Sequence, residues 1–519
     1  MLRNPKTKKN TMHITWKRTW QVLALIVFLG AGMRLYDLGN NSFVADEFLD
    51  INSSYGYAKT GTWQSWDFNF GQPAVVNLNE ARDERAAAYK WQVAALFRFL
   101  PPTEGNARLV SVLWGIFSIV VVFWAGYFYT RKKTIGLLAA FFFAVSISAI
   151  IFDRRLRMYA MFLPVYLALA TILFAFFERA YEGKSTLLKK TWERFGINLL
   201  YLAPLLLLLA LNALVHGLSL SIIPVFGVYA LWMMVSVWRK EHTLKNKYGA
   251  VVGLGILGGI LALVFFPKLV RLGLGTLVWF DDHYSYLEYV LRDFAHPLLG
   301  LLLVGFGSFV IWKRLGREKE ALWLTLSLLV PLTMAIWFWR RNAGPQYIFF
   351  VQSFALLLSA AGGYGLLKVV EERFHEWGKK GMITMGVFLV FLLPNWGYFL
   401  EENNTYHETS TGGNPNYRKV FDYFKKNKEA GDVLITRNFR NYYWSGTQVP
   451  VYDFGGELSE AKFSLAELER IVAEHPHGWV IVSTNDYDYI SHDVEVYFKK
   501  NMEQVSNAQV RGDVEVYRW

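Results

Sequence analysis

Long apolar stretches separated by short basic segments dominate residues 1–400 of the chain. An α-helix needs roughly 20 predominantly apolar residues to cross a bilayer, and stretches of that length recur here. The pattern predicts a polytopic α-helical membrane domain of about eleven transmembrane helices. The predicted spans are residues 20–36, 108–129, 134–152, 158–177, 197–213, 218–238, 248–267, 297–313, 321–339, 346–367 and 381–399.

The pattern changes after residue 401, where polar residues become frequent and the apolar runs shorten. The Asn-, Thr- and Gly-rich stretch 403–416 predicts a linker. The elements expected beyond it are helices at 417–428 and 465–473 and strands at 432–436, 479–483 and 514–517. Residues 401–519 therefore predict a small soluble α/β domain. It contains neither a Gly-rich phosphate loop nor a nucleophile elbow, which favours a supporting or acceptor-docking role over chemistry.

Composition and charge place the chain at a membrane rather than with nucleic acid. Hydrophobic residues make up 53% and charged residues 18% of the 519 positions, whereas soluble domains carry about 25% charged residues. The formal net charge is +12, and the Lys and Arg residues cluster at the ends of the apolar stretches, where membrane lipids account for them. Cysteine is absent, which excludes disulfides and thiolate chemistry.

The distribution of Lys and Arg predicts the orientation of the chain. The segments that share a side with the N-terminus hold most of the basic residues, so the positive-inside rule places the N-terminus in the cytoplasm. The basic start runs into the first span without a small-residue cleavage site and is expected to be an uncleaved anchor. An odd number of spans puts the C-terminal domain outside the cytoplasmic membrane. The long first loop, residues 34–107, lies on the same outer side.

Two adjacent carboxylates, Asp46 and Glu47, follow the first predicted span between apolar neighbours. Ionisable residues next to a membrane span are costly to place and are candidates for function. A carboxylate there can act as a base, bind a metal or pair with a cation. Residues 80–100 of the same loop mix charged with apolar positions, which predicts an amphipathic helix in the membrane interface, with an ordinary surface helix as the alternative.

Several arginines on the predicted outer side run against the positive-inside rule. Arg154 and Arg157 follow Asp153 between the third and fourth spans, and Arg340 and Arg341 lie in a later outer turn. Guanidinium groups match phosphate oxygens, so these four arginines are candidate ligands for the phosphate of an anionic lipid. Snorkelling to lipid phosphates without specificity is the alternative. Arg154 and Arg157 would share one face if their segment were helical.

His216 stands in a very short predicted outer turn. A histidine at a span end is more often a structural hydrogen-bonding group, and a substrate contact or metal ligand is the alternative. Asp281, Asp282 and His283 in a later loop could hold a cation, although their spacing matches no known cage. A divalent metal is therefore left open as a cofactor.

Together these residues suit the transfer of a group from an anionic lipid carrier. A carboxylate can deprotonate an acceptor hydroxyl, and arginines can hold the lipid phosphate that leaves. Such a transfer needs no nucleotide, in agreement with the missing nucleotide loop.

The order of the motifs resembles the GT-C membrane glycosyltransferases, and among them the prokaryotic protein O-mannosyltransferase and aminoarabinose transferase group. The resemblance rests on Asp46-Glu47 after an N-terminal span, on Ala-Arg-Leu-Val-Ser-Val-Leu-Trp-Gly at 107–115, and on Arg157-Met158-Tyr159-Ala160 opening the fourth span. The turn from Arg341 to Tyr347 is a weaker match. The resemblance covers residues 20–400, and its short motifs gain their weight from their order.

The resemblance implies a function and roles for the residues. Members of the group take a sugar from a polyprenyl-phosphate carrier, so the implied donor is such a lipid-linked sugar and the acceptor is a protein, a glycan or a lipid. Asp46 would be the general base, and Glu47 would orient the acceptor or an adjacent group. Asp153 stands where some relatives keep a second acid, although many have serine there.

Two other classes of function compete with a lipid-phosphate-sugar-dependent hexosyl- or pentosyltransferase. A transporter or flippase of lipid-linked or amphiphilic cargo would want charged or broken helices near the bilayer midplane, and the predicted spans are almost free of internal charge. A non-catalytic scaffold would leave the carboxylate pair and the outer arginines without a cause. The sequence therefore favours the enzyme.

Overall fold

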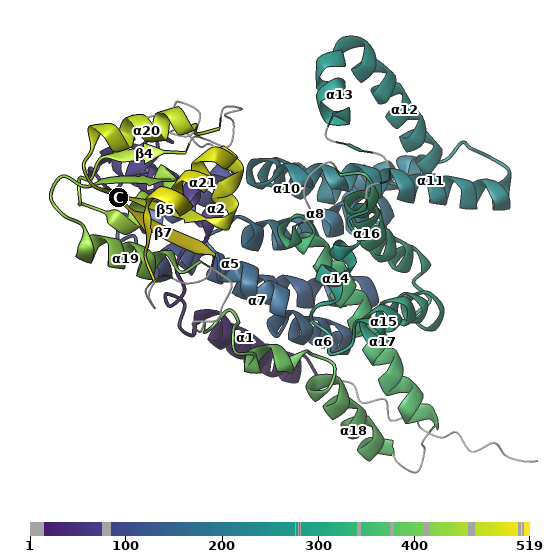
Figure 1. Ribbon diagram of the computed structural model, residues 1–519. Coiled ribbons are helices and arrows are strands. Elements are labelled where there is room, and N and C mark those ends of the chain that lie inside the picture. Colours follow the sequence, from purple (N-terminus) through teal and green to yellow (C-terminus); the bar gives the residue numbers. More distant parts are fainter. Residues whose placement is uncertain are drawn as a thin grey trace, which may run out of the picture.

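The computed structural model describes most of the chain and shows a helical bundle with a small sheet domain at one end (Figure 1). The described residues are 15–74, 85–275, 277–278, 280, 282–339, 344–373, 378–407, 415–454, 462–506, 510 and 513–519.

The helices of the bundle follow the apolar stretches of the sequence. The first half contains α1 (Trp16–Leu35), α2 (Ala45–Thr60), α4 (Ala87–Leu96), α5 (Glu104–Thr130), α6 (Lys133–Ala144), α7 (Ile147–Asp153), α8 (Tyr159–Glu178), α9 (Thr186–Phe195) and α10 (Leu202–Val215). The second half contains α11 (Ile222–Glu241), α12 (Lys247–Phe265), α13 (Pro267–Leu274), α14 (Ser285–Leu291), α15 (Pro297–Phe309), α16 (Glu318–Trp337), α17 (Gln352–Arg373) and α18 (Gly378–Phe391).

The polytopic membrane architecture is confirmed, whereas the predicted number of spans is not. Within the described residues, 7 helices are long and apolar enough to cross a membrane, or up to 9 if each of two bent pairs is one span. One pair is α6 with α7, bent by 60°, and the other joins α9 to residues 199–215 at 108°. The first and last predicted spans correspond to α1, which carries three basic residues, and to the short α18.

Close packing within the bundle depends on small residues at helix crossings. At Gly307 of α15 an added Cβ would lie 1.8 Å from the carbonyl oxygen of Leu358, and at Gly362 of α17 one would lie 2.4 Å from that of Leu303. These glycines let the backbones of α15 and α17 approach closely, as small residues do at helix contacts in membranes.

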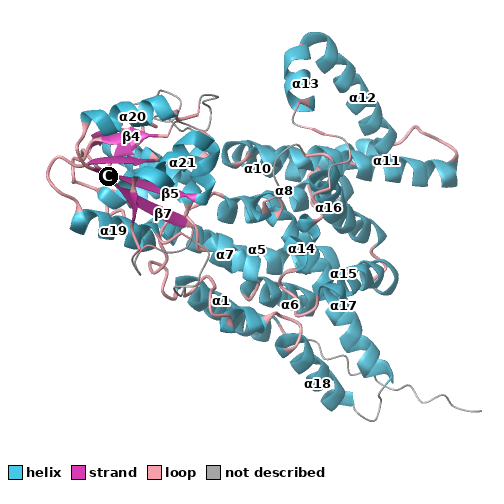
Figure 2. Ribbon diagram, in the orientation of Figure 1, coloured by secondary structure: helices cyan, strands magenta, loops and turns pink. Residues whose placement is uncertain are grey.

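The C-terminal residues form the predicted α/β domain, which carries the magenta strands in Figure 2. Its sheet has the order β4-β3-β5-β7-β6, in which β3 runs parallel to β4 and β5, and β7 runs antiparallel to β5 and β6. All five predicted elements are present. The domain consists of α19 (Tyr417–Asn427), β3 (Val433–Thr436), β4 (Val451–Asp453), α20 (Leu465–Glu474), β5 (Gly478–Ser483), α21 (His492–Asn501), β6 (Glu503–Gln504) and β7 (Val514–Arg518).

The first loop lies between the bundle and the C-terminal domain. Its helix α2 carries Phe48, whose ring packs edge-on against those of Tyr417 and Tyr443. A short hairpin of β1 (Trp66–Asp67) and β2 (Gln72–Pro73) follows α2 and contacts the same domain through hydrogen bonds from Phe68 to Asn441 and back from Gly446. A helix, α4, lies within the stretch 80–100 for which an amphipathic helix was predicted, although residues 80–84 of that prediction lie outside the described residues.

Candidate active site

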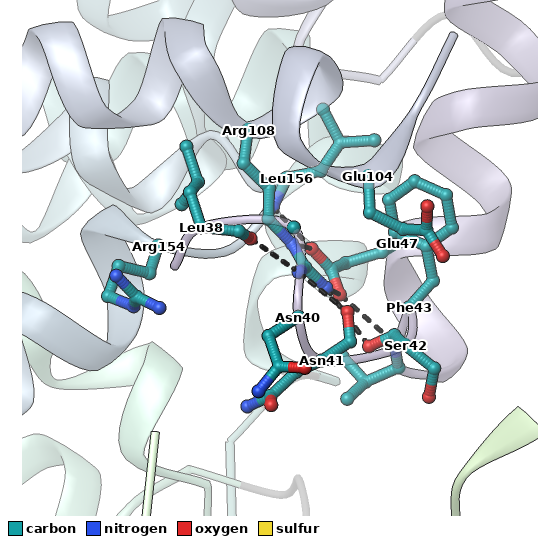
Figure 3. Close-up of polar contacts among 12 residues, drawn as sticks. Leu38, Asn40, Asn41, Ser42, Phe43, Glu47, Glu104, Arg108, Arg154 and Leu156 are labelled. Carbon is teal, nitrogen blue, oxygen red and sulfur yellow. Dashed lines mark hydrogen bonds and ion pairs between the residues drawn. The ribbon is translucent and has the colours of Figure 1, made fainter. Parts of the chain in front are cut away.

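Glu47 is fully buried and paired with Arg108, a residue near the start of α5 (Figure 3). Arg108 donates to both carboxylate oxygens at 2.8 Å, and the backbone amides of Leu156 and Val44 donate at 2.6 and 2.9 Å. Burial alone would raise the pKa of Glu47, but the charge and hydrogen bonds of Arg108, with the two amides, lower this pKa below its usual value. Both carboxylate oxygens of Glu47 thus accept hydrogen bonds that hold the surrounding segments together.

Asp46, the neighbour of Glu47, points the other way and has a 52% exposed side chain. Its Oδ2 lies 3.4 Å from Nη2 of Arg157, whose Nη1 donates to Asp50 Oδ2 at 2.9 Å. Burial disfavours the charge on Arg157, but Asp50 and Asp46 reverse this and raise its pKa. The carboxylate of Asp46 is therefore accessible and lies beside the permanent cation of Arg157.

The structure places two other predicted residues in buried contacts. Asp153 is 1% exposed and accepts a hydrogen bond from Nε of Arg34 at 2.7 Å, so it joins α7 to α1. Arg154 donates to the backbone carbonyls of Arg34, Tyr36 and Asp37 and stacks on a tyrosine ring. These surroundings favour structural roles for Asp153 and Arg154.

The segment from Arg154 to Met158 forms turns and bends rather than a helix, because α7 ends at Asp153 and α8 begins at Tyr159. Arg154 and Arg157 consequently do not share a helical face and have different partners. The bend also directs Arg155 toward the ring of Phe152, 5.7 Å from its centroid. Burial lowers the pKa of Arg155, while the nearby carboxylates of Glu47 and Asp46 oppose that effect. Arg155 therefore belongs to the same charged cluster as Asp46.

The remaining predicted site residues are not brought into this cluster by any described contact. His216 accepts a hydrogen bond from the amide of Leu218 at its Nδ1, and its ring lies 5.5 Å from that of Tyr159. This fits the structural interpretation of the histidine. Arg340 and Arg341 lie outside the described residues.

A divalent cation does not fit the carboxylates of the cluster as they are arranged. Arg157 already bridges Asp46 and Asp50, so a metal would have to displace its guanidinium group. Across the described ranges no group of three or more His, Asp or Glu side chains is placed to hold a metal ion. Asp281, part of the predicted cation site, lies outside those ranges.

Sequence reasoning missed three arginines that pair with acids here: Arg34 with Asp153, Arg108 with Glu47, and Arg418 with Glu104. Arg34 and Arg108 stand at the ends of apolar stretches, and Arg108 belongs to the motif at 107–115 that carried the family resemblance. A charged residue at the end of a membrane span requires a partner if it becomes buried. The position of Arg34 and Arg108 at span ends was therefore the signal that the sequence offered. Nothing in the sequence around Arg418 distinguishes it from the other basic residues of its helix.

Comparison with solved structures identifies the fold as that of the GT-C glycosyltransferases. The oligosaccharyltransferase AglB from Archaeoglobus fulgidus, in complex with an inhibitory peptide and a dolichol-phosphate, aligns over 97% of this chain and 74% of its own, with a TM-score of 0.62 and 10% sequence identity. ArnT from Cupriavidus metallidurans aligns over 96% of this chain and 97% of its own, at TM-scores of 0.53 in the apo state with 12% identity and 0.50 bound to undecaprenyl phosphate with 13% identity. The GT-C fold predicted from the motifs is therefore confirmed.

No protein-family model matches the chain, and no curated protein sequence matches it. At these identities the likeness establishes the fold, while substrates and residue roles must be argued from the site itself.

Proposed function

We propose that the protein is a membrane glycosyltransferase that moves a sugar from a polyprenyl-phosphate carrier to a hydroxyl group of a protein, glycan or lipid acceptor. The observation that carries the proposal is the half-exposed carboxylate of Asp46 beside Arg157. The GT-C fold supports it, as do the structures of similar proteins whose names record bound dolichol-phosphate and undecaprenyl phosphate.

In the proposed reaction Asp46 accepts the proton of the acceptor hydroxyl. The hydroxyl oxygen forms a bond to the anomeric carbon of the sugar, and the bond from that carbon to the phosphate oxygen breaks, with its electron pair leaving on the lipid phosphate. Arg157 orients the carboxylate of Asp46, and Glu47 fixes the start of α2 through Arg108. A fixed base in reach of the acceptor is worth about 10²–10⁴ in rate.

Arg157 and Arg155 are the proposed ligands of the donor phosphate. Both guanidinium groups lie in the bend before α8. Burial disfavours the positive charge of Arg155, and the negative charge of a bound phosphate would stabilise it. Of the other arginines predicted for this role, Arg154 is engaged with backbone carbonyls. Arg340 and Arg341 remain proposals from the sequence.

The proposed orientation places the N-terminus in the cytoplasm and this site and the C-terminal domain on the outer side of the cell membrane. A protease added to sealed cells should then cut near Glu401. If this segment is protected in intact cells but cut in lysed cells, the proposed topology is wrong.

The test of the function is transfer by purified protein carrying Asp46→Asn. We expect this variant to bind a polyprenyl phosphate and to insert in the membrane like the wild type, yet to lose transfer, because the amide cannot take the proton. The donor and acceptor are found first by mass spectrometry of surface glycans from a deletion strain. Near wild-type turnover in the variant would exclude Asp46 as the base.

A further inference from the structure

Two arginines from different domains grip the chain just before α2. Arg108, from the bundle, donates to the carbonyl oxygens of Leu38, Asn41 and Ser42 at 3.2, 2.9 and 3.0 Å. Arg418, from α19 of the C-terminal domain, donates to those of Gly39 and Asn40 at 2.7 and 3.0 Å and again to Asn41 at 3.4 Å. Every carbonyl from Leu38 to Ser42 therefore accepts a hydrogen bond from one of these two groups.

Glu104 ties the two arginines together. It lies one helical turn before Arg108 on the same face of α5, and its Oε1 accepts from Nη2 of Arg418 at 2.6 Å. The hydroxyl of Tyr443, in the C-terminal domain, donates to the same oxygen at 3.0 Å and accepts from the amide of Phe43 at 2.7 Å. The clamp, meaning Glu104, Arg108, Arg418 and Tyr443, thus satisfies a run of backbone groups that form no regular structure.

The clamp ends two residues before α2 begins. Asp46 is the second residue of α2, and it faces Arg157 at 3.4 Å. Phe43, two residues before α2, and Phe48 of α2 also pack against Tyr443. The start of α2 therefore cannot shift without breaking contacts to the C-terminal domain.

We propose that the C-terminal domain positions the base: Arg418 and Tyr443 fix the start of α2 and so set where Asp46 stands relative to Arg157. Arg418 and Tyr443 are positioning residues, since they reach Asp46 only through the backbone of residues 38–45. The expected effect on catalysis rests on the proposed function. The positioning of α2 by Arg418 and Tyr443 does not depend on that function.

The variants Arg418→Lys and Tyr443→Phe test the proposal in the full-length protein. Lysine keeps the charge but cannot reach three carbonyls and a carboxylate at once, and phenylalanine keeps the ring. We expect kcat to fall about tenfold or more with the donor KM nearly unchanged. Arg470→Lys, in an exposed pair with Glu474 on α20 of the same domain, is the matched control and should leave kcat unchanged.

A second readout does not depend on activity. The chain has no cysteine, so cysteines introduced at the exposed Lys59 of α2 and at the exposed Lys132, in the turn between α5 and α6, carry the only spin labels. We expect a narrow distance distribution in the wild type and in Arg470→Lys, and a broadened or shifted one in Arg418→Lys and Tyr443→Phe. An unchanged distribution with unchanged kcat overturns the inference, as does a loss of kcat with an unchanged distribution.

The two readouts separate the inference from the proposed function. If the wild type transfers no sugar but the distributions broaden, the function fails and the positional inference holds. If the wild type is active and neither clamp variant changes kcat or the distribution, the inference fails alone.

Discussion

Arg108 donates one hydrogen bond to each carboxylate oxygen of Glu47, at 2.8 Å in both cases, in a site where neither side chain is more than 5% exposed. This pair of hydrogen bonds distinguishes Glu47 from the adjacent acid, Asp46. Glu47 is held in structural contacts, and Asp46, the proposed base, is the accessible acid of the two. The two adjacent residues should therefore respond differently to the same conservative change.

Glu47→Gln should destabilise the protein, whereas Asp46→Asn should not. The glutamine removes the partner of a buried guanidinium group, a loss that costs about 3–5 kcal/mol, while Asp46 is half exposed. Thermal unfolding followed by fluorescence-detected size exclusion measures the difference. Transfer should be lost in both variants, and a wild-type melting temperature for Glu47→Gln would contradict the structural assignment of Glu47.

Gly115→Ala should disrupt the buried contact between α5 and α7. An added Cβ would lie 2.3 Å from Cγ and Oδ2 of Asp153, which Arg34 holds in place, so α7 would have to move. Overpacking of this kind costs about 1–3 kcal/mol. Gly253→Ala in α12 is the control, because nothing lies within 4 Å of its added Cβ. Equal melting temperatures of the two variants would show that α5 and α7 accommodate the methyl group.

The apolar stretches were sufficient to predict the helical membrane domain, and the alternation of helix and strand was sufficient for the C-terminal domain. The burial of a long apolar run is a local property and can be read from the sequence. Sharp bends are harder to predict. The break between α6 and α7 falls inside one apolar stretch, and Asp293, far along the chain, accepts hydrogen bonds there from Ser146 and the amide of Ser148.

The sequence drew attention to Asp46, Glu47 and Asp153 but could not predict how these acids pair with arginines. The partners of Glu47 and Asp153 are Arg108 and Arg34, which lie far from them in the chain and become neighbours only through helix packing. Arg154 and Arg157 would share a face only if their segment were helical, and the chain bends after Asp153 instead. The bend is set by tertiary contacts such as the amide of Leu156 with Glu47.

Asp293→Asn should stabilise the protein near neutral pH and have no effect in acid. Burial raises the pKa of Asp293 from 3.8 to about 6, and the hydrogen bonds from Ser146 and Ser148 and the charge of Arg292 oppose this only in part. A raised pKa means that the folded state prefers the protonated acid. Its stabilising contribution is complete below pH 3.8 and is lost as the pH rises through about 6.

The loss amounts to about 3 kcal/mol at most, and asparagine, which carries no charge, avoids it. Melting temperatures of the wild type and Asp293→Asn should therefore differ above pH 6 and converge toward pH 4. A difference that persists in acid would mean that the amide changes packing rather than charge.

Arg155→Gln should weaken use of the lipid donor without affecting the fold. In the described part of the chain no carboxylate forms an ion pair with Arg155, and burial lowers its pKa. The charge of Arg155 is therefore unfavourable for folding, and glutamine removes it. We expect the donor KM to rise about tenfold, the loss of roughly one charge-assisted hydrogen bond to phosphate, with the melting temperature equal to or above that of the wild type.

Arg239→Gln, exposed in the last turn of α11, is the control. Binding of a polyprenyl phosphate to the two variants over a range of ionic strength provides the measurement. If Arg155→Gln binds the lipid as the wild type does at every salt concentration, the donor phosphate is held elsewhere, and Arg157 alone remains as its ligand in this bend.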